Sequence, residues 1–292
     1  MPKMSQLATQ IEPLIPRDTY PVLRVTVEYF LRGAEVLSQV NDDVVASLVF
    51  MTLWHGQMQA PSRGPVGIRE LSRKLGMPYE TVRRHARTLV QRGQCVEEKG
   101  GLAVPAAVMR SAPTASMLRR IYVNVVRVLR DLSRIGVARF SLGSDRPVRS
   151  TRLTKEQTVI GIIGTGLLLT GYRELRKFAG GDLMKGLVFT AIWTANVKHV
   201  TNTAAAGDRG ILEDSQRLPV SALAMSRSLR LPYETVRRHA DALLKEGQCV
   251  RVGRKGLVVM ASTHRRHVPT SAAAYHIVMS FLAELRNAGV KV

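Results

Sequence analysis

The chain has 292 residues, with 43 Lys and Arg against 22 Asp and Glu, and its formal net charge is +21 at pH 7. Residues 1–150 carry 22 basic and 12 acidic side chains and residues 151–292 carry 21 and 10, so a basic tail is excluded as the source of the charge. A chain that is basic throughout favours a polyanionic partner, most often nucleic acid, although genome base composition is an alternative source of part of the arginine.

Cysteine usage and hydropathy limit the compartment. Cys95 and Cys249 are too few for a disulfide framework, and we recognise no secretory signal, so we expect the reducing cytoplasm. The longest apolar run, at 159–170, is shorter than the roughly 20 residues that a membrane span needs. We expect a buried helix there and no membrane partner.

An exact repeat organises the chain. The sequence Pro-Tyr-Glu-Thr-Val-Arg-Arg-His-Ala occurs at 78–86 and again at 232–240, 154 residues later. Gly-Gln-Cys-Val follows each copy at the same distance, at 93–96 and 247–250. Chance identity of this length is negligible, so the sequence indicates an internal duplication.

The first half predicts helices and one β-hairpin. After an N-terminal arm at 1–17, hydrophobic periodicity and an Asp43 cap predict helices at 20–40 and 43–58. A helix-turn-helix is expected at 67–92, ended by Gly93, and a hairpin wing at 94–104. The expected closing helix is 115–135.

The second half predicts the same order after a linker at 140–155. The expected elements are helices 156–178 and 182–200, a helix-turn-helix at 220–246, a wing at 248–260 and a closing helix at 271–287. The two repeats are therefore expected to span 18–139 and 156–292. The offset between equivalent residues rises from 139 to 154, which locates an insertion at 201–218 that could contact an effector or partner.

A helix, a turn, a second helix and a β-hairpin together form a winged helix-turn-helix. The predicted fold class is therefore mainly α with small β-hairpin wings, built as two winged repeats. Residues 72–84 and 226–238 resemble the helix-turn-helix of bacterial Crp-type and GntR-type transcriptional regulators. The resemblance implies DNA binding through the helix that begins at Tyr79 and through its counterpart at Tyr233.

The resemblance assigns base-reading roles to Glu80 and Arg84, and to Glu234 and Arg238. A carboxylate accepts a hydrogen bond from cytosine N4, and a guanidinium pairs with guanine O6 and N7. The spacing of four residues presents both groups on one helix face. The alternative is a solvated ion pair between these two side chains.

Further DNA contacts are expected around these readers. The flanking phosphate contacts are Tyr79, Thr81, Arg83 and Arg87, and in the second repeat Tyr233, Thr235 and Arg237. The wings are expected to contribute Lys99 in the first repeat and Arg254 and Lys255 in the second. The second wing is therefore expected to grip DNA better.

The chain departs from the Crp-type pattern at two places. Tyr79 and Tyr233 stand where that family has an arginine, which puts that contact in doubt. Pro78 and Pro232 replace a serine cap. Proline suits the first helical turn but has no capping oxygen, which could leave amides free for a phosphate.

Other chemistry-bearing residues favour structural roles. His85 and His239 are expected to be half-buried structural histidines, and the cysteines small buried hydrophobes. The glycines at 161, 164 and 166 favour close helix packing over a dinucleotide fingerprint. The pair His264 and His267 is too little for a metal site. We recognise no Walker A motif, catalytic triad or zinc constellation in the sequence, so we expect no metal, no cofactor and no enzyme activity.

These observations predict a bacterial, sequence-specific transcriptional regulator that binds double-stranded DNA and is associated with the nucleoid. We expect the duplication to form an intramolecular pseudo-dimer with a pseudo-two-fold axis and a near-palindromic site. The alternative is a plasmid or chromosome replication initiator or a nucleoid-architectural protein. RNA polymerase and a small-molecule effector stay open as further partners.

Overall fold

The computed structural model describes residues 16, 18–62, 64–140, 152–201, 211–254 and 256–292. Within these ranges the chain is mostly helical, with two small antiparallel sheets. Most of the predicted arm (1–17), most of the linker (140–155), the first part of the insertion (201–218) and Lys255 lie outside the described residues.

Two compact units divide the chain, and each contains one helix-turn-helix with its wing. Unit 1 consists of Met1–Leu31, Arg130–Arg139 and Glu174–Ser280, and unit 2 consists of Arg32–Leu129, Phe140–Arg173 and Phe281–Val292. Each unit therefore contains segments from both halves of the sequence. The repeat boundaries 18–139 and 156–292 remain a prediction about the duplication.

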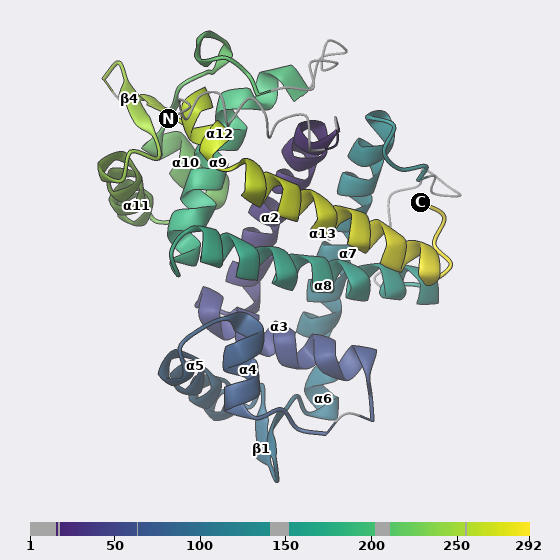
Figure 1. Ribbon diagram of the computed structural model, residues 1–292. Coiled ribbons are helices and arrows are strands. Elements are labelled where there is room, and N and C mark those ends of the chain that lie inside the picture. Colours follow the sequence, from purple (N-terminus) through teal and green to yellow (C-terminus); the bar gives the residue numbers. More distant parts are fainter. Residues whose placement is uncertain (1–15, 17, 63, 141–151, 202–210, 255) are drawn as a thin grey trace, which may run out of the picture. The chain divides into compact units, whose positions relative to one another are not determined.

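The first winged helix belongs to unit 2 and follows the predicted order (Figure 1). Its elements are α3 (Val44–Gln59), α4 (Ile68–Leu75), α5 (Tyr79–Gln91), β1 (Val96–Glu98), β2 (Gly101–Ala103) and α6 (Ala106–Met109). The long helices α2 (Thr19–Val40), α7 (Ala112–Arg134) and α8 (Lys155–Phe178) each contribute part of their length to this unit.

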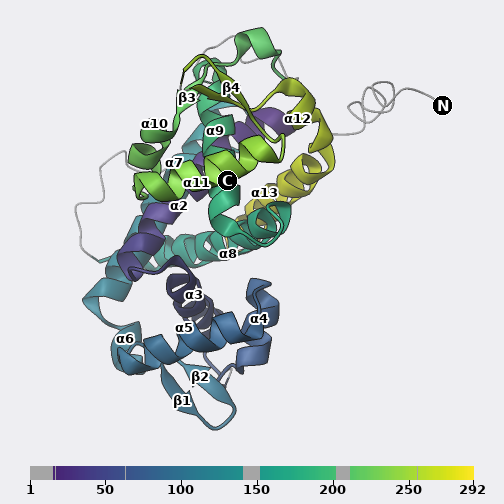
Figure 2. The same cartoon turned by 90° about the vertical axis from the view of Figure 1, so that its left-hand side faces the viewer.

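The second winged helix belongs to unit 1 (Figure 2). Its elements are α9 (Leu183–Thr201), η2 (Asp214–Gln216), β3 (Val220–Ser221), α10 (Ala222–Leu229), α11 (Tyr233–Lys245), β4 (Val250–Val252), β5 (Gly256–Val258) and α12 (Ala261–Arg266). The last helix, α13 (Val268–Asn287), contributes its first part to unit 1 and its end to unit 2.

Each wing pairs with one further segment beyond the predicted hairpin. In unit 1, β5 pairs with β4 and also with β3, in the order β3-β5-β4. In unit 2, β1 pairs with β2, and Val66 forms a bridge to Leu102 that corresponds to the third strand. The short helices α6 and α12 were also absent from the prediction.

Apolar helix faces form the core of each unit. In unit 2 the fully buried side chains include Leu48, Met51 and Trp54 of α3, Leu71 of α4 and Leu89 of α5. In unit 1 the buried cluster takes in Val188, Ile192, Leu229, Val236 and Leu243. The recognition helix of each unit therefore packs on the long helix that precedes the helix-turn-helix.

Glycines of α8 allow close packing within unit 2, as the sequence predicted. A Cβ atom placed on Gly161 would lie 2.6 Å from Cδ1 of Leu118 in α7, and one on Gly166 would lie 3.2 Å from Nε2 of His55 in α3. The apolar run at 159–170 is thus part of a packed helix.

The length and hydropathy of the described helices bear on membrane insertion. None of these helices is, by itself, long and apolar enough to cross a bilayer. The helices Thr19–Val40 and Val44–Gln59 reach the required length and apolar content only when they are taken together, and the chain bends by 93° between them.

Candidate nucleic-acid interface

The turn of each helix-turn-helix is closed by a serine from its first helix. Ser72 Oγ donates to the carbonyl of Met77 at 2.6 Å, and Ser226 Oγ donates to that of Leu231 at 2.7 Å. Gly76 lies in the left-handed region at φ 64°, and its counterpart Arg230 adopts φ 53°. The second turn therefore holds a side chain in a conformation that favours glycine.

The recognition helix α5 separates a buried face from an exposed one. Val82, Ala86 and Leu89 are buried, whereas the four charged residues of the helix are exposed: Glu80, Arg83, Arg84 and Arg87. Tyr79 opens the helix with 42% of its surface exposed, and Tyr233 opens α11 with 44% exposed. In α11, Glu234, Arg237 and Arg238 are exposed in the same way.

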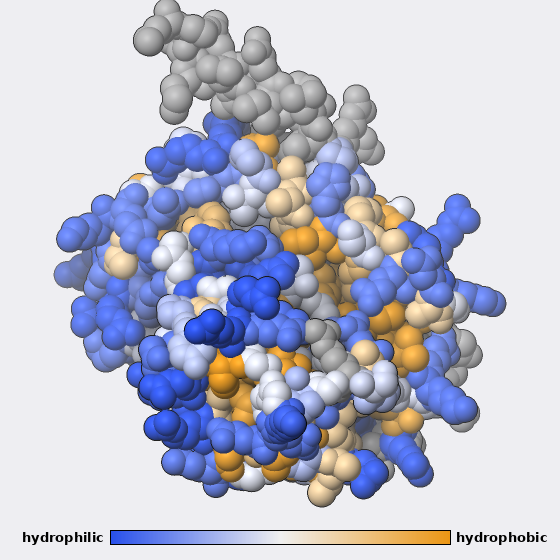
Figure 3. Space-filling model, turned by 60° about the horizontal axis from the view of Figure 1, so that its bottom comes forward, coloured by the Kyte–Doolittle hydropathy of each residue, from blue (hydrophilic) through white to orange (hydrophobic). Residues whose placement is uncertain are grey.

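Thr81 and Thr235 are half-buried at the edge of these exposed faces. Figure 3 brings forward the face that lies at the bottom of Figure 1, where α5 and the β1–β2 hairpin lie. Hydrophilic side chains are abundant on this face, with smaller hydrophobic areas between them. The exposed face of α5 is therefore polar and charged. We refer to α5 as the first reader and to α11 as the second reader.

A histidine fixes the first recognition helix to its supporting helix. Asp43 is the N-cap of α3, and its Oδ1 accepts a hydrogen bond from the backbone N–H of Ala46 at 2.7 Å. The same Oδ1 lies 3.1 Å from Nδ1 of His85, whose side chain is 13% exposed. One carboxylate thus caps α3 and holds α5.

Unit 1 repeats this contact between a histidine of its recognition helix and an aspartate of its supporting helix. Asp182 Oδ1 accepts from the N–H of Lys185 at 3.0 Å, and Asp182 Oδ2 lies 3.4 Å from Nδ1 of His239. Burial lowers the pKa of His239 against the opposing effect of Asp182. A structural role for both histidines is confirmed, although His239 is more buried than predicted.

Each recognition helix begins without a side-chain cap. Pro78 and Pro232 occupy the N-cap positions, and neither helix has a capping side-chain hydrogen bond there. This agrees with the expectation from sequence. The first-turn amides of α5 and α11 carry the positive end of the helix dipole.

The ion pair on the first reader differs from the predicted alternative. Glu80 Oε2 contacts Arg83 rather than Arg84, at 2.7 Å from Nη2 and 2.8 Å from Nε. Arg84 Nη2 lies 3.4 Å from Nε2 of His85. The predicted alternative, a solvated ion pair between Glu80 and Arg84, is therefore wrong, because Glu80 pairs with the arginine three residues later instead of four. Arg83 is consequently engaged with Glu80 in this conformation.

The second reader carries a longer chain of charges. Glu234 Oε2 lies 2.8 Å from Nη2 of Arg237, and Arg237 Nη1 lies 3.2 Å from Asp241 Oδ2. Asp241 Oδ1 also lies 3.6 Å from Nη2 of Arg251 on β4. Asp241, which stands where the first reader has Arg87, therefore links the recognition helix to the wing.

Side-chain amides attach each wing to its supporting helix. Gln57 of α3 accepts from the N–H of Val104 at 2.7 Å and donates to the carbonyl of Val104 at 3.3 Å. Asn196 of α9 is fully buried, accepts from the N–H of Val259 at 2.9 Å and donates to the carbonyls of Leu218 and Leu257. Sequence reasoning missed both residues, and only their matching positions 139 residues apart could have indicated them.

The predicted wing contacts lie at the hairpin tips. Lys99 is exposed in the turn between Glu98 and Gly101, and Arg254 is exposed in the turn between β4 and β5. Lys255 lies outside the described residues. The wing cations are therefore placed to reach a ligand beyond the hairpins.

The remaining candidates have structural surroundings. Burial raises the pKa of the Cys95 thiol to about 12 and that of Cys249 to about 11, which leaves both as neutral, buried side chains. His264 packs edge-on against Tyr20 and Trp193, whereas Nε2 of His267 lies 2.9 Å from Oε1 of Gln248.

The described end of the insertion is built into unit 1. Arg217 is buried and donates to the carbonyls of Leu212 and Val259, and Asp214 accepts from the N–H of Ala261 at 2.6 Å. Glu213 lies 3.1 Å from Arg265. Residues 211–218 therefore hold the wing and α12 together, and a contact with an effector or partner stays a prediction for the insertion.

The geometry defines a helix-turn-helix with an exposed charged reader and an attached wing. Residues 60–97, which contain α4 and α5, match the family model of the IclR helix-turn-helix domain. The class of protein is thus a DNA-binding transcription regulator, whose partner is double-stranded DNA. The matching type is IclR, whereas the sequence resemblance pointed to Crp-type and GntR-type regulators. No curated protein and no solved structure matches the chain.

Proposed function

We propose that the protein is a sequence-specific transcriptional regulator that reads double-stranded DNA with two recognition helices, α5 and α11. The observation that carries the proposal is the recurrence of one reader on one scaffold. The two helices share nine residues, the same histidine-to-cap contact and the same serine-closed turn. A net charge of +21 supplies the attraction to the phosphate backbone.

Arg84 and Arg238 are the proposed base readers. Both are exposed, and no carboxylate contact is recorded for either in the described part of the chain. A guanidinium fork of this kind pairs with O6 and N7 of guanine in the major groove. Glu80 and Glu234 would accept from cytosine while keeping their arginine neighbours, and Tyr79, Tyr233 and the wing cations would contact the backbone.

The composition of the two units supports a fused pseudo-dimer. Unit 2 combines the first winged helix with Phe140–Arg173 and Phe281–Val292, and unit 1 combines the second with Met1–Leu31 and Arg130–Arg139. The exchanged segments occupy matching places in the two sequence repeats. Such reciprocal exchange is what a duplicated homodimer would leave in one chain, so we propose a pseudo-two-fold axis and a pseudo-palindromic site.

A bacterial cytoplasm, in association with the nucleoid, is the compartment that this function implies. RNA polymerase is a candidate partner at promoters. The second candidate function is a replication initiator or a nucleoid-architectural protein, favoured by the presence of two winged helices in one chain. Bound sites clustered near a replication origin would favour it over regulation.

Selection of bound sequences from randomised duplex DNA tests the proposal. We expect two similar half-sites in inverted orientation, about 34 Å apart between successive major grooves. Half-sites in tandem orientation would contradict the pseudo-dimer, and the absence of any enriched sequence would contradict base reading. Mapping bound sites in cells then separates promoters from a replication origin.

A further inference from the structure

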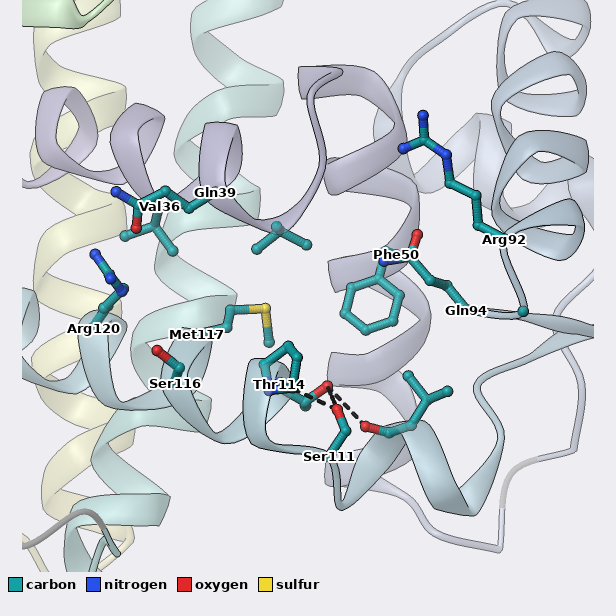
Figure 4. A pocket seen from close by; sticks show the side chains of 14 residues that line it. Val36, Gln39, Phe50, Arg92, Gln94, Ser111, Thr114, Ser116, Met117 and Arg120 are labelled. Carbon is teal, nitrogen blue, oxygen red and sulfur yellow. Dashed lines mark hydrogen bonds between the residues drawn. The ribbon is translucent and has the colours of Figure 1, made fainter.

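A cavity of about 360 Å³ lies beside the first reader, within unit 2 (Figure 4). Its volume is within the range of small-ligand pockets. The end of α2, the middle of α3, the start of α7 and the segment that joins α5 to β1 supply its walls. The apolar part of the lining includes Val36, Val40, Phe50, Val108 and Met117.

The charged part of the lining has one sign. Arg92 and Arg120 line the cavity, and none of its 14 lining residues is Asp or Glu. Figure 4 shows the two arginines on opposite sides of the space. The first turn of α7, which begins after Ser111, also lines the cavity and adds the positive end of a helix dipole.

One polar atom next to this cavity lacks a partner. Oε1 of Gln94 is buried and accepts no hydrogen bond from the described residues. Its counterpart in unit 1 is Gln248, whose Oε1 lies 2.9 Å from Nε2 of His267. The two equivalent glutamines therefore have different surroundings in the two units.

Side-chain volume explains why the cavity is open in unit 2. In unit 1 three rings pack together at the corresponding place: the centroid of Phe178 lies 5.0 Å from that of Phe189 and 4.7 Å from that of His267. Phe178 ends α8 as Val40 ends α2. His267 corresponds to Thr114, because both residues precede by 22 positions the glycine that follows the helix, Gly136 or Gly289.

The cation pattern changes with the packing. Arg92 corresponds to Glu246, which lies 2.7 Å from Lys185, and Arg120 corresponds to Ala273. The repeat that keeps the space open therefore also has the two arginines, and the repeat that fills the space has neither. Volume and charge vary together, as expected if a ligand occupies the open site.

We propose that this cavity binds a small organic carboxylate with an apolar body, and that the bound anion regulates the first reader. The carboxylate is attracted by the positive charges of Arg92 and Arg120, and the apolar part lies against Val40, Phe50 and Met117. Arg92, Gly93 and Gln94 join α5 to β1, so occupation changes the joint between reader and wing. The regulatory half of the proposal rests on the DNA-binding function above, and the binding half does not.

Calorimetric titration of the full chain without DNA tests binding. The probes are octanoate and phenylacetate, each compared with its uncharged amide. We expect at least one carboxylate to bind and its amide to bind about tenfold more weakly or not at all, because a charge-assisted hydrogen bond is lost. Equal binding of acid and amide, or no binding by either acid, would overturn the site.

Variants locate the site. Arg92→Gln and Arg120→Gln should each weaken the binding carboxylate about tenfold, whereas the exposed Arg127→Gln on the same α7 should leave it unchanged. Val40→Phe with Thr114→His copies the filled unit and should abolish binding. The arginine variants decide the question if the filled variant unfolds, and binding unaffected by all of them overturns the proposal.

Fluorescence anisotropy with the selected duplex tests regulation. The carboxylate should change the affinity for the first half-site severalfold, and the change should disappear in Arg120→Gln. Binding without any effect on DNA affinity would overturn the regulatory half alone. Absence of DNA binding both with and without the carboxylate would instead contradict the proposed function, so the two failures are distinguishable.

Discussion

The two winged helices share a scaffold and differ in what surrounds it. Both readers begin after a proline, close their turn with a serine and bind an N-cap aspartate through a histidine. The first helix carries Arg87 and lies beside the cavity of unit 2. The second helix carries Asp241 at the equivalent position, and packed aromatic rings stand at the place that corresponds to the cavity. Identical readers are therefore set in unlike electrostatic and packing surroundings.

This difference shows that sequence identity in the readers has two physical causes. Val82, His85 and Ala86 repeat because they pack against or bind the supporting helix. Glu80, Arg83 and Arg84 have no buried role and repeat on the exposed face. Under the proposed function, only the second group can contribute to sequence preference.

The wing attachments should give the largest difference in stability. Asn196→Ala should destabilise unit 1 by about 3 kcal/mol, because it removes three hydrogen bonds to backbone groups, two of them buried. Gln57→Ala should cost unit 2 about 1–2 kcal/mol, since Gln57 is half-buried and serves one residue. Chemical denaturation followed by fluorescence measures both, and equal losses would contradict the comparison.

Acid should destabilise both units, and the loss of stability in unit 1 should continue to a lower pH than the loss in unit 2. Burial lowers the pKa of His264 from 6.5 to about 3 and that of His55 in unit 2 to about 4. A histidine whose pKa is lowered in the folded protein contributes fully to the free energy of unfolding above pH 6.5. This contribution is lost as the pH falls from 6.5 toward the pKa in the folded protein. Each histidine then costs up to about 1.4 kcal/mol per pH unit.

Each unit contains one tryptophan, Trp193 in unit 1 and Trp54 in unit 2. Trp54→Phe and Trp193→Phe therefore provide a separate fluorescence signal for each unit. Replacing His264 by Phe should reduce the pH dependence of unit 1 between pH 6 and 4, where His239 and His267 with their lowered pKa values still contribute, and leave that of unit 2 unchanged. An unchanged slope in unit 1 would show that His264 is not the titrating group.

Removing the base readers should affect one half-site at a time. Arg84→Ala and Arg238→Ala should each cost roughly 1–3 kcal/mol of DNA-binding free energy and relax sequence preference in one half-site. Competition with half-site variants measures the preference. Unchanged selectivity in both variants would remove the base-reading assignment, whereas a uniform loss across all sequences would reassign these arginines to phosphate.

Exchanging the charges at the equivalent positions Arg87 and Asp241 should have a smaller effect on DNA affinity. Asp241→Arg gives the second helix the charge of the first and releases Arg251, while Arg237 keeps its contact with Glu234, so DNA affinity should rise by about 1 kcal/mol with a steeper salt dependence. Arg87→Asp should do the opposite. Glu156→Arg makes the same charge change outside the readers and wings and is the control; an equal gain there would indicate net charge alone.

Helix positions were the part of the fold that the sequence predicted well. Apolar residues at helical spacing and turn residues set α2, α3, α5, α9 and α11 to within a few residues, and Asp43 was the expected cap. The exposed Glu and Arg positions of both readers were also identified. These features depend on local periodicity and backbone chemistry, which a single sequence contains.

The rest depends on contacts between distant residues. The single-turn helix α6 and the two-residue strand β3 are too short for a periodic pattern, and the pairing of Glu80 with Arg83 is a choice between two neighbours of similar distance. The cavity follows from the joint size of Val40 and Thr114, which lie 74 residues apart. No local pattern reports such a volume.

The interleaved composition of the two units has a practical consequence for dividing the chain. A polypeptide that ended in the linker at 140–155 would contain the first winged helix but would lack the segments of α8 and α13 that complete unit 2. It would also carry Met1–Leu31 and Arg130–Arg139 without the winged helix that they complete. The two halves of the gene should therefore yield folded protein only when they are expressed together.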